Sequence, residues 1–95
     1  MVFDLSEITG IDIANSKQEK SRTIYYKGDK AFLVVNKNTI ELRCDTKLAD
    51  LLKEKYESVM ESRYFGRGGI EVVLAGQLSY DDLADLTRLS YNLSA

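Results

Sequence analysis

The sequence predicts an α+β domain, a two-layer sandwich in which an antiparallel sheet of about five strands has helices packed on one face. Two observations support this prediction. Segments with the twofold alternation of β-strands occur in groups, separated by residues typical of tight turns. Two segments with leucines at helical spacing follow these groups. Strands grouped in this way favour an antiparallel sheet over a doubly wound parallel one.

The segment 39–56 joins a strand to a helix, and the rest of the predicted fold is arranged around it. One face of the strand is apolar, with Ile40, Leu42 and Cys44, and the other is polar, with Thr39, Glu41 and Arg43. Asp45 follows, and its side chain suits a helix N-terminus. Apolar residues then recur at helical spacing, at Leu48, Leu51, Leu52 and Tyr56. We expect this helix to pack back on the sheet.

Two strands precede this segment and form a hairpin. Residues 22–27 and 30–36 are rich in β-branched and aromatic side chains, and Gly28 and Asp29 mark the turn between them. A second turn at residues 37–38 leads into the strand at 39–44, so that the three strands form an antiparallel meander. Residues 31–35 are apolar on both faces. The second face of this strand is therefore expected to be covered, either by the chain itself or by another subunit.

The remaining segments complete the sheet and add a second helix. Residues 58–65 are expected to form a fourth strand or an extended connection, 66–69 a glycine-rich turn, and 70–74 a strand. Ser79 stands three residues before Asp82, the spacing of a capping box. The helix that it begins has an apolar stripe at Leu83, Leu86, Leu89 and Leu93.

The N-terminal segment contains a second pair of residues with capping spacing, Asp4 and Glu7. One or two helical turns are expected there, ended by Gly10, and the alternation of Ile11 and Ile13 also permits a short strand. Residues 15–21 contain no apolar side chain and are expected to form a loop.

Size and composition limit the class of protein. Ninety-five residues provide material for one domain, residues 1–95, with one core. No apolar run approaches the roughly 18 residues of a membrane span, and acids stand near the N-terminus where a secretory signal has positive charge. A single cysteine, Cys44, forms no internal disulfide and falls on the apolar face of its strand. We expect a cytoplasmic protein without a membrane partner.

Histidine is absent, which removes the usual general base near neutral pH and the commonest metal ligand. This excludes most catalytic triads, and the remaining residue types provide neither a base for a cysteine-protease arrangement at Cys44 nor the ligands of a zinc site. Three acids at Asp81, Asp82 and Asp85 lie where they favour the helix dipole, and they lack further convergent ligands for a metal. We therefore expect no enzyme, no metal and no cofactor.

A basic region stands out against the formal net charge of −2. Residues 15–47 contain eight cations and four acids, which gives +4 for this stretch. Its candidate contacts to nucleic acid are Tyr25, Lys27, Lys30, Lys37 and Arg43, because cations neutralise phosphates and tyrosine stacks on bases. The alternative is that lysines at turns keep the edges of the hairpin from pairing with other chains.

A second candidate is the stretch 63–69, which contains three glycines and two arginines. Arg63 and Arg67 can clamp a phosphate that the glycine N–H groups approach closely. The stretch lacks the lysine and hydroxyl of a nucleotide-binding P-loop. The alternative is an ordinary hairpin turn.

Several short motifs resemble the MmcQ/YjbR family of small bacterial proteins over roughly residues 22–94. They are Lys30-Ala-Phe, Ile40-Glu-Leu-Arg-Cys-Asp45, Leu48 with Leu52 and Tyr56, Gly76 with Leu78, and Leu89-Ser-Tyr-Asn-Leu93. The resemblance implies a two-layer α+β fold similar to secretion chaperones or frataxin, and a DNA-binding role. The chain departs from the family pattern around residues 63–70, where it has neither the histidine nor the lysine-tryptophan pair of many members, and it lacks most of their N-terminal helix.

Two hypotheses of function follow. The first is a non-enzymatic domain that binds DNA weakly through the basic hairpin and the glycine-arginine stretch. The second is a protein-interaction module, a homodimer in its simplest form, in which the doubly apolar strands 31–35 and 70–74 are covered by another chain.

Overall fold

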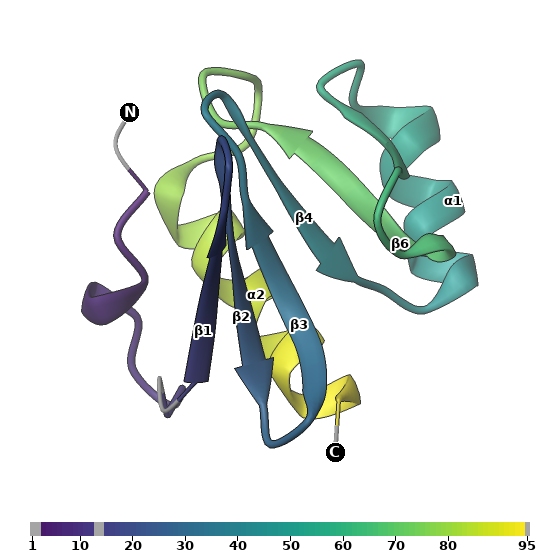
Figure 1. Cartoon of the computed structure of the whole chain (residues 1–95). Coiled ribbons are helices and arrows are strands. Elements are labelled where there is room, and N and C mark those ends of the chain that lie inside the picture. Colours follow the sequence, from purple (N-terminus) through teal and green to yellow (C-terminus); the bar gives the residue numbers. More distant parts are fainter. Residues whose placement is uncertain (1–2, 13–14, 95) are drawn as a thin grey trace.

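The computed structural model describes residues 3–12 and 15–94, and it shows an α+β fold with a six-stranded antiparallel sheet (Figure 1). The strands are β1 (Asn15–Glu19), β2 (Arg22–Lys27), β3 (Lys30–Val35), β4 (Thr39–Arg43), β5 (Val59–Ser62) and β6 (Gly66–Val73). Their order across the sheet is β1-β2-β3-β4-β6-β5, and each neighbouring pair is antiparallel. The expected fold class is confirmed, with six strands in place of about five.

Two helices, α1 (Thr46–Lys55) and α2 (Tyr80–Leu93), begin where the capping residues predict. The Asp45 side chain accepts a hydrogen bond from the Leu48 N–H at 3.4 Å. Ser79 and Asp82 form a reciprocal capping box at the start of α2. These side chains satisfy N–H groups that have no partner inside the helix, which fixes where each helix starts.

The N-terminal capping pair produces less structure than a full helix. A single 3₁₀ turn, η1 (Leu5–Glu7), follows Asp4, whose carboxylate accepts from the Ser6 N–H at 3.0 Å. Leu5 is buried against the main core, so the turn is held by packing. The alternative strand at Ile11 and Ile13 lies partly outside the described residues, because residue 13 is not among them, and Ile11 is not in a strand.

The polar segment expected to be a loop is mostly a strand, so that prediction is wrong for residues 15–19. β1 pairs in register with β2, with Lys17 opposite Ile24. It is an edge strand with mostly exposed side chains, and no apolar alternation is needed to stabilise it. β1 is stabilised by backbone pairing with β2, and a strand of this kind has no hydropathy pattern by which it could be predicted. Lys20, with a positive φ of 32°, makes the turn that follows.

The prediction of a turn at residues 66–69 is also wrong. β6 begins at Gly66, and the chain turns just before it, at residues 63–65. Gly69 lies opposite Arg43 in the sheet, and a Cβ atom there would stand 2.6 Å from the Cβ of Phe65 and 2.5 Å from the Leu42 carbonyl. The glycine is required because Phe65 folds over this strand.

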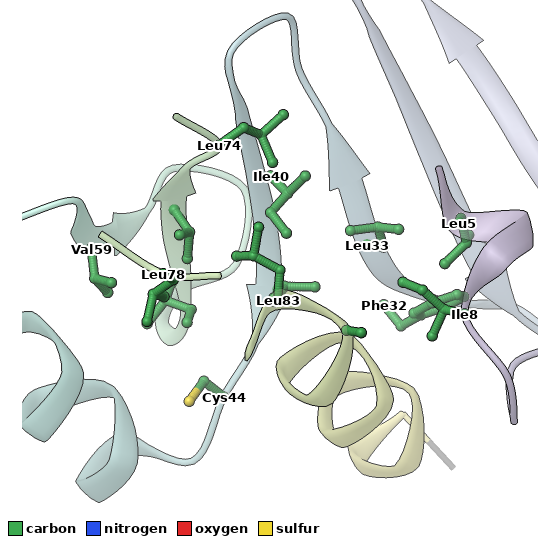
Figure 2. Close-up of a cluster of buried hydrophobic side chains, with 14 of the residues drawn as sticks. Leu5, Ile8, Phe32, Leu33, Ile40, Cys44, Val59, Leu74, Leu78 and Leu83 are labelled. Atoms are coloured by element: carbon green, nitrogen blue, oxygen red, sulfur yellow. The ribbon is translucent and has the colours of Figure 1, made fainter. Parts of the chain in front are cut away.

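The main core lies between the sheet and the helices (Figure 2). β4 and β6 supply Ile40, Leu42, Ile70 and Val72, and the helices add Ala49, Leu83 and Ala84. A bulge in β3 leaves Phe32 without a direct partner on β2, so that Phe32 and Leu33 both face this core.

Ser90 of α2 links the helix to two strands. Its hydroxyl donates to the Phe32 carbonyl and accepts from the Arg43 N–H at 2.8 Å. The hydroxyl thus replaces a strand-to-strand hydrogen bond at the place where the β3–β4 ladder stops, and it leaves no buried polar group unpaired there.

Within the described residues, no helix has both the length and the apolar character required to cross a bilayer.

Candidate functional site on the outer face of the sheet

The face of the sheet that points away from the helices, here called the outer face, is partly covered by the chain itself. Phe65 and Tyr26 pack there against a second cluster formed by Ile24, Ala31 and Val34. Arg43 also lies over the Phe65 ring, with its guanidinium carbon 5.0 Å from the ring centroid. The apolar outer side of β3 therefore does not need another subunit to bury it.

Two carboxylates stand side by side on the outer face. Glu41 of β4 and Glu71 of β6 are direct partners in the sheet, and both are buried, with 1% and 3% of their surface exposed. Burying two acids is costly unless each is ionically paired or hydrogen-bonded. The neighbouring segments supply those partners.

Glu41 accepts three hydrogen bonds from its own chain. Its Oε1 atom accepts from the Ser62 hydroxyl and the Tyr64 N–H, both at 2.9 Å, and its Oε2 atom accepts from the Asn36 amide at 3.0 Å. Burial works against ionisation and is the largest single influence on this carboxyl. The hydrogen bonds and the nearby Arg63 guanidinium together outweigh it and lower the pKa of Glu41. Glu41 is thus an ionised anchor for the 63–65 turn.

Glu71 is held in the same way by a cation and a hydroxyl. Arg63 donates to both of its oxygens, at 3.0 and 2.9 Å, and Thr39 donates to Oε2 at 2.7 Å. The hydrogen bond to Glu71 is the main reason that the pKa of Arg63 is raised. A two-point contact of this kind fixes the guanidinium plane, while three quarters of the Arg63 side chain remains exposed.

An open cavity of about 1080 Å³, here called the outer cavity, surrounds these groups. Its walls are the β1–β2 turn at residues 19–22 and the β3–β4 turn at 36–39, together with Glu41, Arg63, Tyr64 and Glu71. The formal charge of its walls is 4 − 3 = +1, from four cations (Lys20, Arg22, Lys37, Arg63) and three acids (Glu19, Glu41, Glu71). The cavity is mildly basic on a chain whose net charge is −2.

Tyr64 is the exposed aromatic side chain of the outer cavity, with 38% of its surface exposed. The Arg22 guanidinium lies 5.3 Å from its ring centroid and is itself held by Glu19 through two hydrogen bonds. Partial burial is the main reason that the pKa of the Tyr64 hydroxyl is raised, with the neighbouring Tyr26 adding to it. The ring is neutral near pH 7 and presents an aromatic surface beside cations.

All three acids of the outer cavity have partners within the chain, whereas its two lysines, Lys20 and Lys37, form no ion pair with any residue that the structure describes. They project from different turns that border the same cavity. Among the described charges of the outer cavity, those left without an ion-pair partner are therefore both positive.

The seven predicted nucleic-acid contacts do not form one surface. Lys37 and Arg63 line the outer cavity, and Lys30 and Arg67 are exposed elsewhere. Tyr25 packs against the main core. Lys27 donates to the Tyr91 carbonyl at 3.2 Å and lies over the Tyr91 ring. Arg43 donates to the Ala31 carbonyl at 2.7 Å.

The glycines of the arginine-containing stretch belong to the sheet. Gly66 is opposite Ser62, Gly69 is opposite Arg43, and the Gly68 carbonyl accepts from the Cys44 N–H. Successive N–H groups of a strand point to opposite sides, so these glycines do not form a cradle of converging N–H groups for a phosphate. Arg63 remains a candidate through its side chain alone.

Sequence reasoning missed Lys20, Arg22 and Tyr64 as members of one site, and it missed the carboxylate pair. Glu41 and Glu71 each carried a signal, because each is a charged residue between apolar neighbours in a strand. The pairing of β4 with β6 is what brings them together, and that order is not readable from a single sequence.

Among residues 3–12 and 15–94, no three acidic, histidine or cysteine side chains converge as metal ligands would. Comparison of the chain with models of protein families, with curated proteins and with solved structures finds no match. The resemblance to the MmcQ/YjbR family therefore stays a prediction that rests on its short motifs.

Proposed function

We propose that the chain is a binding domain whose outer cavity takes a single strand of nucleic acid, with DNA as the class that the family resemblance implies. The observation that supports this most is the meeting of Tyr64 with Lys20 and Lys37 in one cavity. An exposed ring stacks on an unpaired base, and lysines without partners neutralise phosphates of the same strand. A duplex has no unpaired base to offer Tyr64, so a single strand is preferred.

The charges of the outer cavity favour binding over catalysis. A general base near neutral pH needs a raised carboxyl pKa and access to a substrate. The pKa of Glu41 is lowered, and both of its oxygens accept hydrogen bonds from its own chain. The Glu71 carboxylate accepts hydrogen bonds from Arg63 and Thr39. We therefore propose that the domain is not an enzyme. We also propose the cytoplasm as its compartment, which suits the buried, unpaired Cys44.

Weak and salt-dependent affinity is expected. Two unpaired lysines release about two counterions from a single strand, which lowers affinity roughly fivefold to tenfold between about 50 mM and about 200 mM salt. The net charge of −2 limits affinity further, so we expect a dissociation constant of about 10–100 μM at the lower salt concentration.

Fluorescence anisotropy with labelled single-stranded and duplex oligonucleotides tests the proposal. Lys37→Glu is expected to weaken single-strand binding about fivefold or more, because it places a repelling charge in the outer cavity. Tyr64→Ala is expected to weaken it by a similar factor through lost stacking. Lys30→Glu is the matched control, since it makes the same charge change at the exposed first residue of β3, at the opposite end of the strand from Lys37.

Equal losses for Lys37→Glu and Lys30→Glu would mean that attraction is diffuse and that the outer cavity is not the site. Absence of salt-dependent binding at about 100 μM protein would remove the proposal altogether.

A further inference from the structure

The helix side of the sheet has an apolar groove between α1 and α2. α1 packs on β5 and β6, whereas α2 packs on β3 and β4, so the two helices cover different parts of the sheet. Between them lies an apolar cavity of about 80 Å³, with Leu42, Cys44 and Ile70 at the sheet and Leu48 on α1. Figure 2 shows Cys44 in this position between the two helices. We call this feature the helix groove.

The helix groove is bordered by leucines that the chain leaves in solvent. On α2 the border consists of Leu86, Leu89 and Leu93, which share one side of the helix, and Leu89 and Leu93 are 47% and 56% exposed. On α1, Leu51 is 63% exposed and lies on the same side as Leu48, one turn away. Leucines are exposed on both sides of one groove. Covering such an apolar surface removes it from water and is favourable.

The two helices differ in charge on the sides that border the helix groove. Lys55 follows Leu48 by seven residues and Leu51 by four, so it shares their side of α1. Asp82 and Asp85 precede Leu86 and Leu89 by four residues each and share their side of α2. Asp82 also accepts from the Ser79 N–H and Asp85 pairs with Arg88 at 2.9 Å, and with Asp81 the first turns of α2 keep a net negative charge. The groove therefore has a basic wall at the end of α1 and an acidic wall at the start of α2.

The directions of the helices place these opposite charges level with each other. α1 follows the end of β4 and α2 follows the end of β6, and these strands are antiparallel. The helices therefore begin at opposite ends of the sheet and run in opposite directions. The last turn of α1, with Lys55, is level with the first turns of α2, with Asp82 and Asp85.

We propose that the helix groove is covered by a second copy of this chain, in a dimer whose twofold axis runs along the groove. Rotation about this axis places α1 of one copy against α2 of its partner, so that leucines meet leucines and Lys55 faces Asp82 and Asp85 in both halves. A twofold axis across the groove would instead pair α1 with α1 and α2 with α2. The paired helices would then run antiparallel, and Lys55 would face the start of the partner's α1 with no acid of α2 opposite it, which is why the observations favour the first arrangement.

This dimer does not depend on nucleic-acid binding, because the outer cavity lies on the opposite face of the sheet. It also differs from a dimer through the outer side of β3, which Tyr26 and Phe65 already cover. Both copies keep their outer cavities open in the proposed arrangement.

Sedimentation equilibrium over about 5 μM to about 500 μM protein tests the proposal, with dimer expected within that range. Leu89→Glu is expected to raise the dissociation constant at least about tenfold, since it places a charge in the buried contact. Met60→Glu is the matched control. Met60 is 41% exposed on edge strand β5, opposite Glu71 on the outer face, and its substitution is expected to change the dissociation constant less than about twofold.

A charge swap tests the orientation of the two copies. Lys55→Glu and Asp85→Lys are each expected to weaken the dimer about threefold, and the double variant is expected to recover most of the loss. The mass of one chain throughout the concentration range would overturn the proposal. So would equal effects of Leu89→Glu and Met60→Glu, and a double variant no better than the single ones would overturn the proposed axis.

Discussion

Glu41 shows how a buried charge specifies a structure in a small domain. Its two oxygens meet three donors from three segments, Asn36 after β3, Ser62 in β5 and Tyr64 in the turn that follows. Ser62 is buried and the hydrogen bonds from the other two donors are partly buried, so the carboxylate that pairs with all three sets where these segments lie. The shape of the outer cavity thus depends on a buried carboxylate in its wall.

Glu41→Gln keeps the size of the side chain and removes its charge. The amide NH₂ group cannot accept a hydrogen bond, so at least one of the three donors is left unpaired in a buried site. We expect the free energy of unfolding to fall by about 2 kcal/mol, measured by urea denaturation. Glu54→Gln on the exposed side of α1 is the control and is expected to change stability by less than about 0.5 kcal/mol. Equal stability of the two variants would contradict the anchoring role.

The same residue predicts a pH dependence. Because folding lowers the pKa of Glu41, its contribution to stability is complete above the pKa of the unfolded chain, about 4.3, and is lost as the pH falls through the lower folded value. We expect wild-type stability to fall more steeply than that of Glu41→Gln between about pH 5 and about pH 3. Parallel curves from urea denaturation at each pH would show that Glu41 is not ionised differently in the two states.

Among the elements, the turn between β5 and β6 does most to shape the outer cavity. It folds residues 63–65 back over the outer face, with Phe65 on Gly69 and Tyr64 in the outer cavity. Gly69→Ala is expected to lower stability by about 1–3 kcal/mol, because its methyl group would overlap Phe65 and the Leu42 carbonyl. Thermal unfolding followed by circular dichroism measures the loss.

Gly68→Ala is the control for that substitution. A Cβ atom at Gly68 would approach no atom closer than the Phe65 carbonyl at 3.9 Å, which is ordinary contact. We expect a change of less than about 0.5 kcal/mol. If both variants lose the same stability, the intrinsic cost of alanine in β6 explains the effect and the packing of Phe65 does not.

Elements with strong local signals were predictable, and those without them were not. The strand and helix at 39–56 and the capped helix after Ser79 combine alternation, helical spacing and capping residues that agree with one another. β1 has no apolar pattern because it is a polar edge strand. The start of β6 has no side-chain pattern because it is made mostly of glycine, which identifies a turn in other contexts.

At the scale of the whole molecule, the six-stranded sheet separates two surfaces of different character. The outer face carries a mildly basic cavity with an exposed tyrosine, and the helix side carries exposed leucines around a groove. Of the predicted contacts, Lys37 and Arg63 lie in the outer cavity. These two could be predicted because turns and exposed cations can be recognised from the local sequence. Lys20, Tyr64 and the two buried acids join them only through strand order and the fold of one turn.

Backbone amide NMR with an unlabelled single-stranded oligonucleotide tests whether a single strand of nucleic acid binds in the outer cavity. We expect chemical-shift changes that increase with added oligonucleotide and centre on residues 20–22, 37–39 and 63–64. Changes centred instead on Lys27, Lys30 and Arg67, or an unchanged spectrum at about 1 mM oligonucleotide, would contradict the proposal.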